Sequence, residues 1–305
     1  MTNNSYMFEN YINLARSFIG DKHYDKALRF YDKAYNTEFG KTDIELILDI
    51  ALLYSELQLF KDAEEKFMEV ISLDIKEPRA YYGIGVLYDE KKEYKEAVKY
   101  YKKAIELDEG YDRAYFFLAN VYDELGETAK AIENYKKVIK LVPNDFWAHV
   151  NLGVIYEELE ENEIALEYTK KAVLLNQTHY KALFNMGVVL NKLGREAESI
   201  EYYNKSINQN AEYAFSFLNL AVIYREENKF EEAVRIISQG IENNPEEGFL
   251  YYNRACFYVH LNKLQEAFQD VIKSIEQNNF FEQYMKEDEE LDTIRQLDEY
   301  KNRFE

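Results

Sequence analysis

The sequence contains little of what cross-links or interrupts a chain, since its 305 residues include one cysteine, three prolines and eleven glycines. A single thiol, Cys256, cannot form a disulfide within the chain, which fits a reducing compartment. With so few prolines and glycines, long irregular turns are not expected, and helices should follow one another closely. A run of about 18 apolar residues, the length that a bilayer-spanning helix needs, is also missing.

Positive charge is scarce too, because 57 Asp and Glu residues outnumber 37 Lys and Arg residues and the net charge is −20. A surface this acidic repels phosphate backbones, which argues against nucleic acid as a direct partner, and it favours basic or mixed-charge proteins. Residues 1–20 lack a basic start followed by a long apolar stretch, so no signal peptide is expected. We therefore expect no membrane segment and a cytoplasmic location.

Small residues recur along the chain on two regular grids. The first grid has a spacing of 34 residues, with one earlier step of 36, and consists of Ala27, Ala63, Ala97, Ala131, Ala165, Ser199, Ala233 and Ala267. The second grid lies 12 residues upstream and consists of Ala15, Ala51, Gly85, Ala119, Gly153, Gly187, Ala221 and Ala255. Small side chains let two helices approach closely, and we expect the aromatic residue three positions after most upstream members to fill the remaining space.

Within each period the apolar residues are three or four positions apart, which is typical of helices rather than strands. Tyr81, Ile84 and Tyr88 form one such stripe, and Gly126 is placed to adopt a left-handed turn between two stripes. The three prolines lie at junctions between periods, at Pro78, Pro143 and Pro245. A single helix pair cannot bury its own apolar face, so the pattern predicts one solenoid domain of stacked pairs.

These positions resemble the tetratricopeptide repeat (TPR) family over most of the chain. Gly153, Tyr156, Ala165 and Ala172 match the family pattern of small and aromatic positions. Departures at individual repeats are Ser199, Leu190, Thr169, Ile237 and Val271. The resemblance implies an all-α fold, a right-handed superhelical solenoid of antiparallel helix pairs whose first helices line a concave groove.

The grid predicts an N-terminal extension over residues 1–7, eight repeats over residues 8–281, and a C-terminal capping helix over residues 282–305. The cap is expected because an uncovered solenoid end would invite aggregation. The expected repeats are 8–43, 44–77, 78–111, 112–145, 146–179, 180–213, 214–247 and 248–281.

No pattern of catalytic residues is recognisable. Gly83-Ile84-Gly85 follows no strand and lacks a third glycine, so helix packing explains it. The four histidines show no ligand-like pairing, and Cys256 is expected to be a small, buried or half-buried residue. We expect neither enzymatic activity nor a cofactor nor a metal ion.

A row of asparagines lies at one position of successive repeats, at Asn151, Asn185, Asn219 and Asn253. An amide offers both a donor and an acceptor to a peptide backbone. In glycosyltransferase-linked family members, a ladder at this position grips peptides, so the resemblance implies partner binding here. The alternative is that these amides only bond locally. Asp49, Gly83 and Phe117 interrupt the row, which confines any ladder to the C-terminal half.

Aromatic and charged residues are also expected at the groove. The aromatic set, which serves either as apolar anchor pockets or as packing between repeats, is Tyr82, Phe116, Phe117, Trp147, Phe184, Phe215, Phe249 and Tyr252. Acidic residues recur at equivalent positions in Asp89, Asp123 and Glu157, while Arg79, Arg113 and Lys181 lie nearer the other edge. An acidic rim favours a partner that carries basic residues beside apolar anchors; an ordinary solvated face is the alternative.

The resemblance also raises the question of whether the chain has the carboxylate-binding site of one group of family members. Chaperone-binding members hold a terminal carboxylate with lysine, asparagine and arginine; Asn120 matches one position, but Phe116 replaces the lysine. That clamp is not expected. The sequence favours an adaptor that binds an extended protein segment in the groove, mainly along repeats five to eight. The alternatives are a structural subunit that uses convex or end surfaces and a peptide-responsive signalling regulator, and a homo-oligomer is left open.

Overall fold

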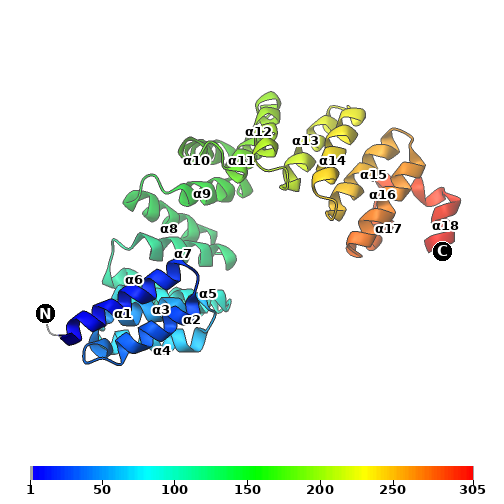
Figure 1. Cartoon of the computed structure of the whole chain (residues 1–305). Helices are drawn as coiled ribbons and strands as arrows, with labels where there is room; N and C mark the ends of the chain where they lie inside the picture. The colour runs from blue at the N-terminus through cyan, green and yellow to red at the C-terminus, as the bar shows by residue number, and fades with distance from the viewer. Residues whose placement is uncertain (1–2, 305) are drawn as a thin grey trace. The chain divides into compact units, whose positions relative to one another are not determined.

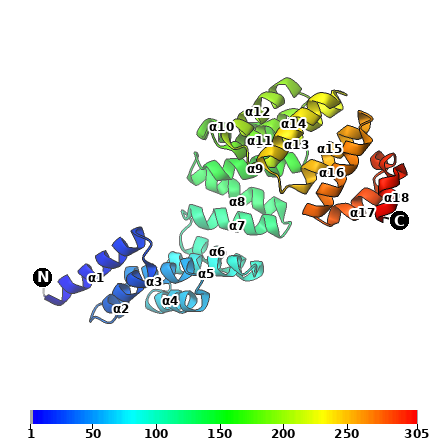
Figure 2. The same cartoon turned by 45° about the vertical axis from the view of Figure 1, so that its right-hand side comes forward.

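A computed structural model describes residues 3–304, and all regular structure in this range is helical (Figure 1). The predicted all-α fold of tandem helix pairs is confirmed, and in both views the two helices of a pair run side by side in opposite directions (Figures 1 and 2). The first helices are α1 (Asn3–Gly20), α3 (Ile44–Glu56), α5 (Pro78–Glu90), α7 (Asp112–Glu124), α9 (Phe146–Glu158), α11 (Tyr180–Lys192), α13 (Ala214–Glu226) and α15 (Gly248–His260). The second helices are α2 (Tyr24–Tyr35), α4 (Phe60–Leu73), α6 (Tyr94–Leu107), α8 (Thr128–Leu141), α10 (Asn162–Leu175), α12 (Glu196–Gln209), α14 (Phe230–Asn243) and α16 (Leu264–Gln277). Among these helices, none combines the length and the apolar composition that crossing a membrane requires.

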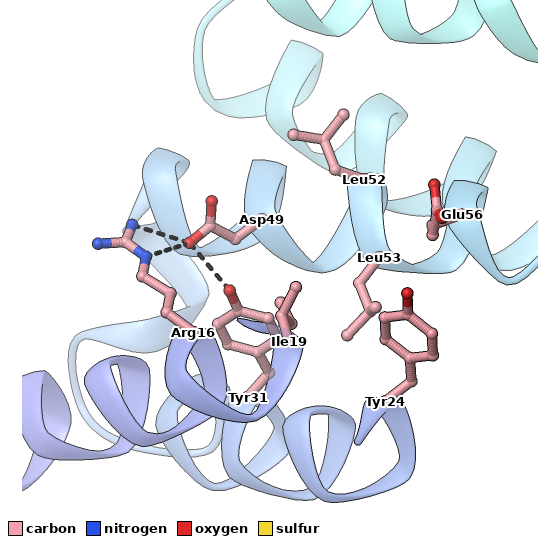
Figure 3. Close-up of a pocket in the computed structure, with 8 residues that line it drawn as sticks. All are labelled: Arg16, Ile19, Tyr24, Tyr31, Asp49, Leu52, Leu53 and Glu56. Carbon is pink, nitrogen blue, oxygen red and sulfur yellow. Dashed lines mark hydrogen bonds and ion pairs between the residues drawn. The ribbon is translucent and has the colours of Figure 1, made fainter. Parts of the chain in front are cut away.

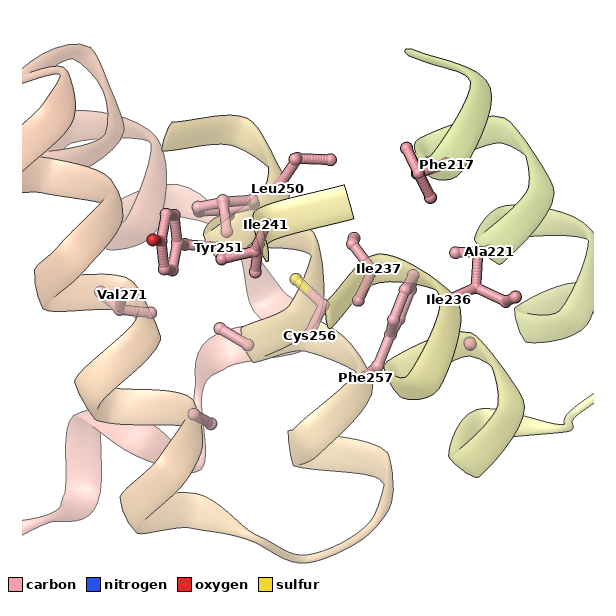
Figure 4. Close-up of a cluster of buried hydrophobic side chains, with 14 of the residues drawn as sticks. Phe217, Ala221, Ile236, Ile237, Ile241, Leu250, Tyr251, Cys256, Phe257 and Val271 are labelled. Carbon is pink, nitrogen blue, oxygen red and sulfur yellow. The ribbon is translucent and has the colours of Figure 1, made fainter. Parts of the chain in front are cut away.

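The chain separates into two compact units, Met1–Ala148 and His149–Glu305. Phe67 and Ile84 belong to a core of the N-terminal unit, where both side chains are essentially inaccessible to solvent. In the C-terminal unit, Ile237, Leu250 and Phe257 lie among the buried side chains drawn in Figure 4. Each unit is therefore held by apolar contacts between successive helices.

The small residues of the upstream grid face the second helix of their own pair. A Cβ atom on Gly85 would lie 2.7 Å from the ring of Tyr101, far inside normal contact distance. Tyr88, three residues after Gly85, stacks instead on Tyr100 with 5.5 Å between ring centroids. The expectation that the following aromatic fills the space is wrong here, because that residue lies on an adjacent side of the helix and the ring comes from across the pair.

A serine fills one node of the alanine grid without leaving a buried polar group unpaired. Ser199 is fully buried, and its Oγ donates a hydrogen bond to the backbone oxygen of Gly187 at 2.7 Å. Because the acceptor belongs to the first helix of the same pair, the substitution adds a bond between the two helices.

The turn within each pair contains one residue in the left-handed region. Gly126 and Gly194 adopt φ values of 71° and 70°, which confirms the prediction for Gly126. The equivalent residues elsewhere are not glycine, although their φ values lie between 56° and 61°: Lys22, Gln58, Lys92, Glu160, Asn228 and Asn262. A side chain in this conformation costs about 1 kcal/mol, so packing on both sides of the turn must impose it.

The two ends of the chain differ from the expected extension and single capping helix. Helix α1 begins at Asn3, ahead of residue 8. The C-terminal segment consists of two short helices, α17 (Phe280–Glu287) and α18 (Asp298–Phe304), joined by the 3-10 turns η2 (Glu289–Leu291) and η3 (Ile294–Gln296). A straight helix would bury one stripe, whereas the turns bring Met285, Leu291 and Ile294 all to full burial.

A buried ion pair joins the last two repeat helices and provides a test of this packing. Arg254 Nε and Nη2 donate to the two carboxylate oxygens of Asp270 at 2.6 and 2.8 Å. Replacing Asp270 with alanine leaves a largely buried guanidinium with its bond to Ser238 but without a carboxylate partner. We expect a loss of about 3–5 kcal/mol of unfolding free energy in urea denaturation followed by circular dichroism. Glu276→Ala, which breaks the exposed pair with Lys273, should cost less than about 1 kcal/mol. Equal costs for both variants would contradict this.

Candidate functional site

The candidate site lies on one face of the first helices. We define the groove face as the side of α11 that carries Phe184 and Val188, together with the residues at the same register in the other first helices. Between α9 and α11 this face contains a cavity of about 290 Å³. Its walls are Gly153, Val154, Glu157, Phe184, Asn185, Val188 and Val189. The cavity is mostly apolar, with one amide and one carboxylate at its surface.

The four predicted asparagines are all half-buried, but they differ in their hydrogen bonds. Asn253 Nδ2 donates to the backbone oxygen of Phe249 in its own helix at 2.8 Å. The side chains of Asn185 and Asn219 make no hydrogen bond within the described part of the chain. The local alternative therefore accounts for Asn253, while Asn185 and Asn219 keep donors and acceptors for a ligand.

The aromatic residues divide between packing and exposure. Tyr82 contacts Tyr101, Tyr111 and Phe117 at centroid distances of 5.1–5.9 Å, and burial raises its pKa to about 12. Phe116 and Phe184 are similarly half-buried against neighbouring rings. Phe215 and Trp147 remain accessible, with 48% and 46% of their surface exposed. Phe215 stacks on Phe249 at 5.1 Å and offers an apolar surface in the C-terminal unit.

Tyr252 was predicted to face a partner, and that prediction is wrong. Only 5% of its surface is exposed. Its ring stacks on Phe281 at 5.3 Å, and its hydroxyl donates to the carboxylate of Asp288. Tyr252 has the register of the groove face, but the C-terminal segment covers this part of the face.

The three predicted acidic residues differ in their surroundings. Asp89 accepts a hydrogen bond from the hydroxyl of Tyr101 at 3.2 Å, and its pKa is raised by burial and by nearby Glu90 and Glu124. Burial and Glu124 also raise the pKa of the Asp123 carboxyl. Neither Asp89 nor Asp123 forms an ion pair with a described residue. In the C-terminal unit, Glu157 is neutralised by Lys192.

Of the three predicted basic residues, one is already engaged by carboxylates. Arg79 donates two bonds to Glu45, at 3.0 and 2.6 Å, and further bonds to Glu77. These carboxylates raise its pKa further. Arg113 and Lys181 are exposed and form no ion pair within the described chain.

A second cavity of about 460 Å³ lies on the groove face between the first two repeats (Figure 3). On one side Asp49 accepts bonds from Arg16 Nε at 2.9 Å and from the Tyr31 hydroxyl at 3.2 Å. Leu52, which lines the cavity, is 55% exposed. The sequence analysis did not predict this cavity, because it considered Asp49 only as an interruption of the asparagine row. The signal in the sequence was Leu52, a large apolar residue at a groove position.

Cys256, Asp288 and Glu290 place a thiol and two carboxylates within 4.8 Å of one another. The thiol is buried, as expected, and burial raises its pKa. Glu290 already forms an ion pair with Arg225, and Asp288 already accepts a hydrogen bond from Tyr252, so both carboxylates have partners within the protein. We assign this cluster to packing of the C-terminal segment.

Family models match this arrangement of helices. Models described as tetratricopeptide repeats match residues 78–111, 148–179, 180–213 and 216–248, and a model described as a TPR repeat matches residues 119–160. Together these ranges span more than half of the chain. The chain belongs to the tetratricopeptide repeat family. None of the matching models describes a catalytic domain, and repeats of this family generally serve as protein-interaction scaffolds.

Several solved structures share the fold. YrrB, a TPR protein with an unusual peptide-binding site, is 26% identical and aligns with a TM-score of 0.53 over 60% of this chain and 94% of its own. A TPR protein from Parabacteroides merdae ATCC 43184, 19% identical, aligns with a TM-score of 0.62 over 80% of this chain and 97% of its own. The APC/C hetero-tetramer Cut9–Hcn1 aligns with a TM-score of 0.57 and 16% identity over 93% of this chain and 60% of the matched chain. No curated protein gives a significant match.

The family's terminal-carboxylate clamp was not expected, and Asn120, its single matching residue, serves packing within the pair. The side-chain oxygen of Asn120 accepts a hydrogen bond from the hydroxyl of Tyr135 in α8. Phe116 packs edge-on against the same Tyr135 ring at 5.7 Å. These two groove positions in this TPR protein therefore hold α7 to α8.

The raised pKa of Asp89 predicts a pH-dependent stability effect. A carboxyl with a raised pKa in the folded state binds its proton more tightly than in the unfolded state, so its stabilising contribution is present in acid and lost as pH rises. We expect Asp89→Asn to raise the unfolding midpoint slightly at neutral pH and to match the wild type near pH 4. Glu109→Gln, an exposed carboxylate with the same charge change, should leave the midpoint unchanged. A Glu109→Gln effect as large as that of Asp89→Asn would show that only net charge matters.

Proposed function

We propose that this TPR protein is an adaptor whose C-terminal unit binds an extended partner segment on the groove face of α9, α11 and α13. The carrying observation is the cavity of about 290 Å³ beside Asn185, whose amide has no partner within the described chain. A cavity of this size accommodates one large apolar side chain of a partner. An adjacent unpaired amide can then bond the backbone that carries this side chain.

The exposed aromatic surface supports a second contact. Phe215 stacks on Phe249 and is 48% exposed, so a further apolar side chain of the partner can cover it. Asn219, half-buried in the same helix as Phe215, provides a second unpaired amide. Alternating apolar and amide contacts suit an extended segment, whose side chains and backbone groups alternate along its length.

Unpaired acidic groups support a preference for basic partners. Asp89 and Asp123 in the N-terminal unit have raised pKa values and no ion pair among the described residues, so a lysine or arginine would relieve their mutual repulsion with Glu124. YrrB, which shares the fold, is a peptide-binding TPR protein. We also propose a cytoplasmic location, with which the free, buried thiol of Cys256 is compatible.

One observation favours the alternative of a structural subunit. A cavity of about 390 Å³ lies on the second-helix side of the C-terminal unit, lined by Leu174, which is 66% exposed, and flanked by Lys170 and Lys205. An apolar side chain beside acidic residues of a neighbouring subunit would fit this cavity. In that case the groove face would be dispensable.

Capture of partners from a lysate of the source organism, identified by mass spectrometry, separates the two functions. We expect Asn185→Ala/Asn219→Ala to weaken binding of groove partners roughly tenfold or more, because each lost hydrogen bond is worth about 0.5–1.5 kcal/mol. Asn204→Ala is the matched control, since its amide bonds the backbone of Ile200 within α12. If the double variant and the wild type bind the same partners equally, the groove proposal fails and the subunit function replaces it.

Binding of a partner through Asp89 and Asp123 can be recognised by its dependence on salt concentration. A partner that contacts these carboxylates with lysine or arginine should be released progressively as salt rises, because screening weakens exposed charge pairs. Asp89→Asn/Asp123→Asn should remove this salt dependence. A partner whose capture is insensitive to both salt and substitution would contradict the basic-partner proposal.

A further inference from the structure

Neighbouring first helices contact each other near their C-terminal ends. The residue before the last in one helix lies close to the last residue of the next first helix. In α9 and α11 these residues are Glu157 and Lys192, which form an ion pair. In α13 and α15 the same positions hold Arg225 and His260. Neither side chain can carry a negative charge, so the two cannot form an ion pair with each other, and neutralising Arg225 requires a carboxylate from elsewhere.

The chain's own C-terminal segment supplies that carboxylate. Arg225 Nη2 donates to the two oxygens of Glu290 at 3.3 and 3.2 Å, and His260 Nε2 lies 2.6 Å from Oε1 of Glu290. The His260 ring stacks on Phe230 at 4.3 Å, which fixes its orientation. The hydroxyl of Tyr252 donates to Asp288, two residues before Glu290. Three groups from α13 and α15 thus converge on two carboxylates of one short turn.

This turn covers the surface that is open two repeats earlier. Tyr252 and Cys256 in α15 have the same register as Phe184 and Val188 in α11, which line the cavity of about 290 Å³. In α15 both residues are buried, with 5% and 4% of their surfaces exposed. The C-terminal segment, with rings of α17 on Tyr252 and the acidic turn at Cys256, therefore occupies in α15 the place that a ligand would occupy in α11.

We propose that Arg225, His260 and Tyr252 form a carboxylate-binding subsite that takes an acidic segment with two carboxylates two residues apart, and that the chain's own turn, residues 288–290, is its resident ligand. The bound turn closes the groove face at α15, so that a partner segment has α9, α11 and α13 available. This inference deepens the proposed function and rests on it for the role of the groove face. Its test uses the isolated full chain without a partner, so either proposal can fail alone.

The test compares hydrogen exchange of the turn in two variants that lose the same charge. Glu290→Gln removes the carboxylate that Arg225 and His260 hold, whereas Glu289→Gln alters an exposed neighbour. The reporting amides include that of Leu291, which donates to the backbone oxygen of Asp288 at 3.1 Å. We expect exchange over residues 288–297 to accelerate about tenfold in Glu290→Gln, because losing a charge-assisted bond shifts a local opening equilibrium by roughly that factor. Glu289→Gln should exchange like the wild type.

A charge reversal keeps the proposal testable if Glu290→Gln proves poorly folded. Arg225→Glu should open the turn, and Arg225→Glu/Glu290→Arg should restore protection at least in part by re-forming the pair with reversed charges. Cys256, the single cysteine, reports independently, because iodoacetamide should alkylate its thiol faster whenever the turn opens. The proposal is overturned if Glu290→Gln and Arg225→Glu exchange within about twofold of the wild type, or if Glu289→Gln opens the turn equally.

Discussion

Close contact between a small residue on the first helix and the side chain that faces it from the second helix is the constraint on which the rest of the structure depends. Gly85 lies so near Tyr101 that even one methyl group would collide with the ring, and Gly187 and Tyr203 repeat this contact in the C-terminal unit. Because this contact sets the separation within a pair, it determines how the next first helix packs. The groove face is the side that this packing leaves uncovered.

On this repeated backbone, the charged residues at the ends of the first helices differ from repeat to repeat. In the N-terminal unit burial, together with Glu90 and Glu124, raises the pKa of the Asp89 carboxyl, which forms no ion pair with a described residue. In the C-terminal unit Glu157 is matched by Lys192, whereas Arg225 at the position of Glu157 pairs with Glu290. A change of one residue at this position therefore changes the charge of the local surface. Asp89 favours a cation, the Glu157–Lys192 pair is neutral, and Arg225 binds a carboxylate.

The C-terminal segment shows how a cap can stabilise an array and also limit its binding surface. Leu291 and Ile294 are fully buried, so the segment supplies the apolar cover that the last repeat lacks. Its acidic turn simultaneously meets the donors of α13 and α15. Because one short stretch does both, stability of the cap and accessibility of the groove face are physically linked.

The sequence by itself determined the helical repeat, because the spacing of small and apolar residues reflects packing between neighbours that are close in the chain. It also placed Asn185 and Phe184 on one side of the same helix, since both follow from the helical period, and both side chains line one cavity. Only the tertiary structure decided that Tyr252 is buried and that Asn253 bonds its own helix. Periodicity reports which side of its own helix a residue occupies, but not whether a distant segment such as residues 288–290 folds over that side or whether an amide bonds its own backbone. The burial of Tyr252 depends on a segment that lies outside the repeats, so the repeat pattern of the sequence carries no information about it.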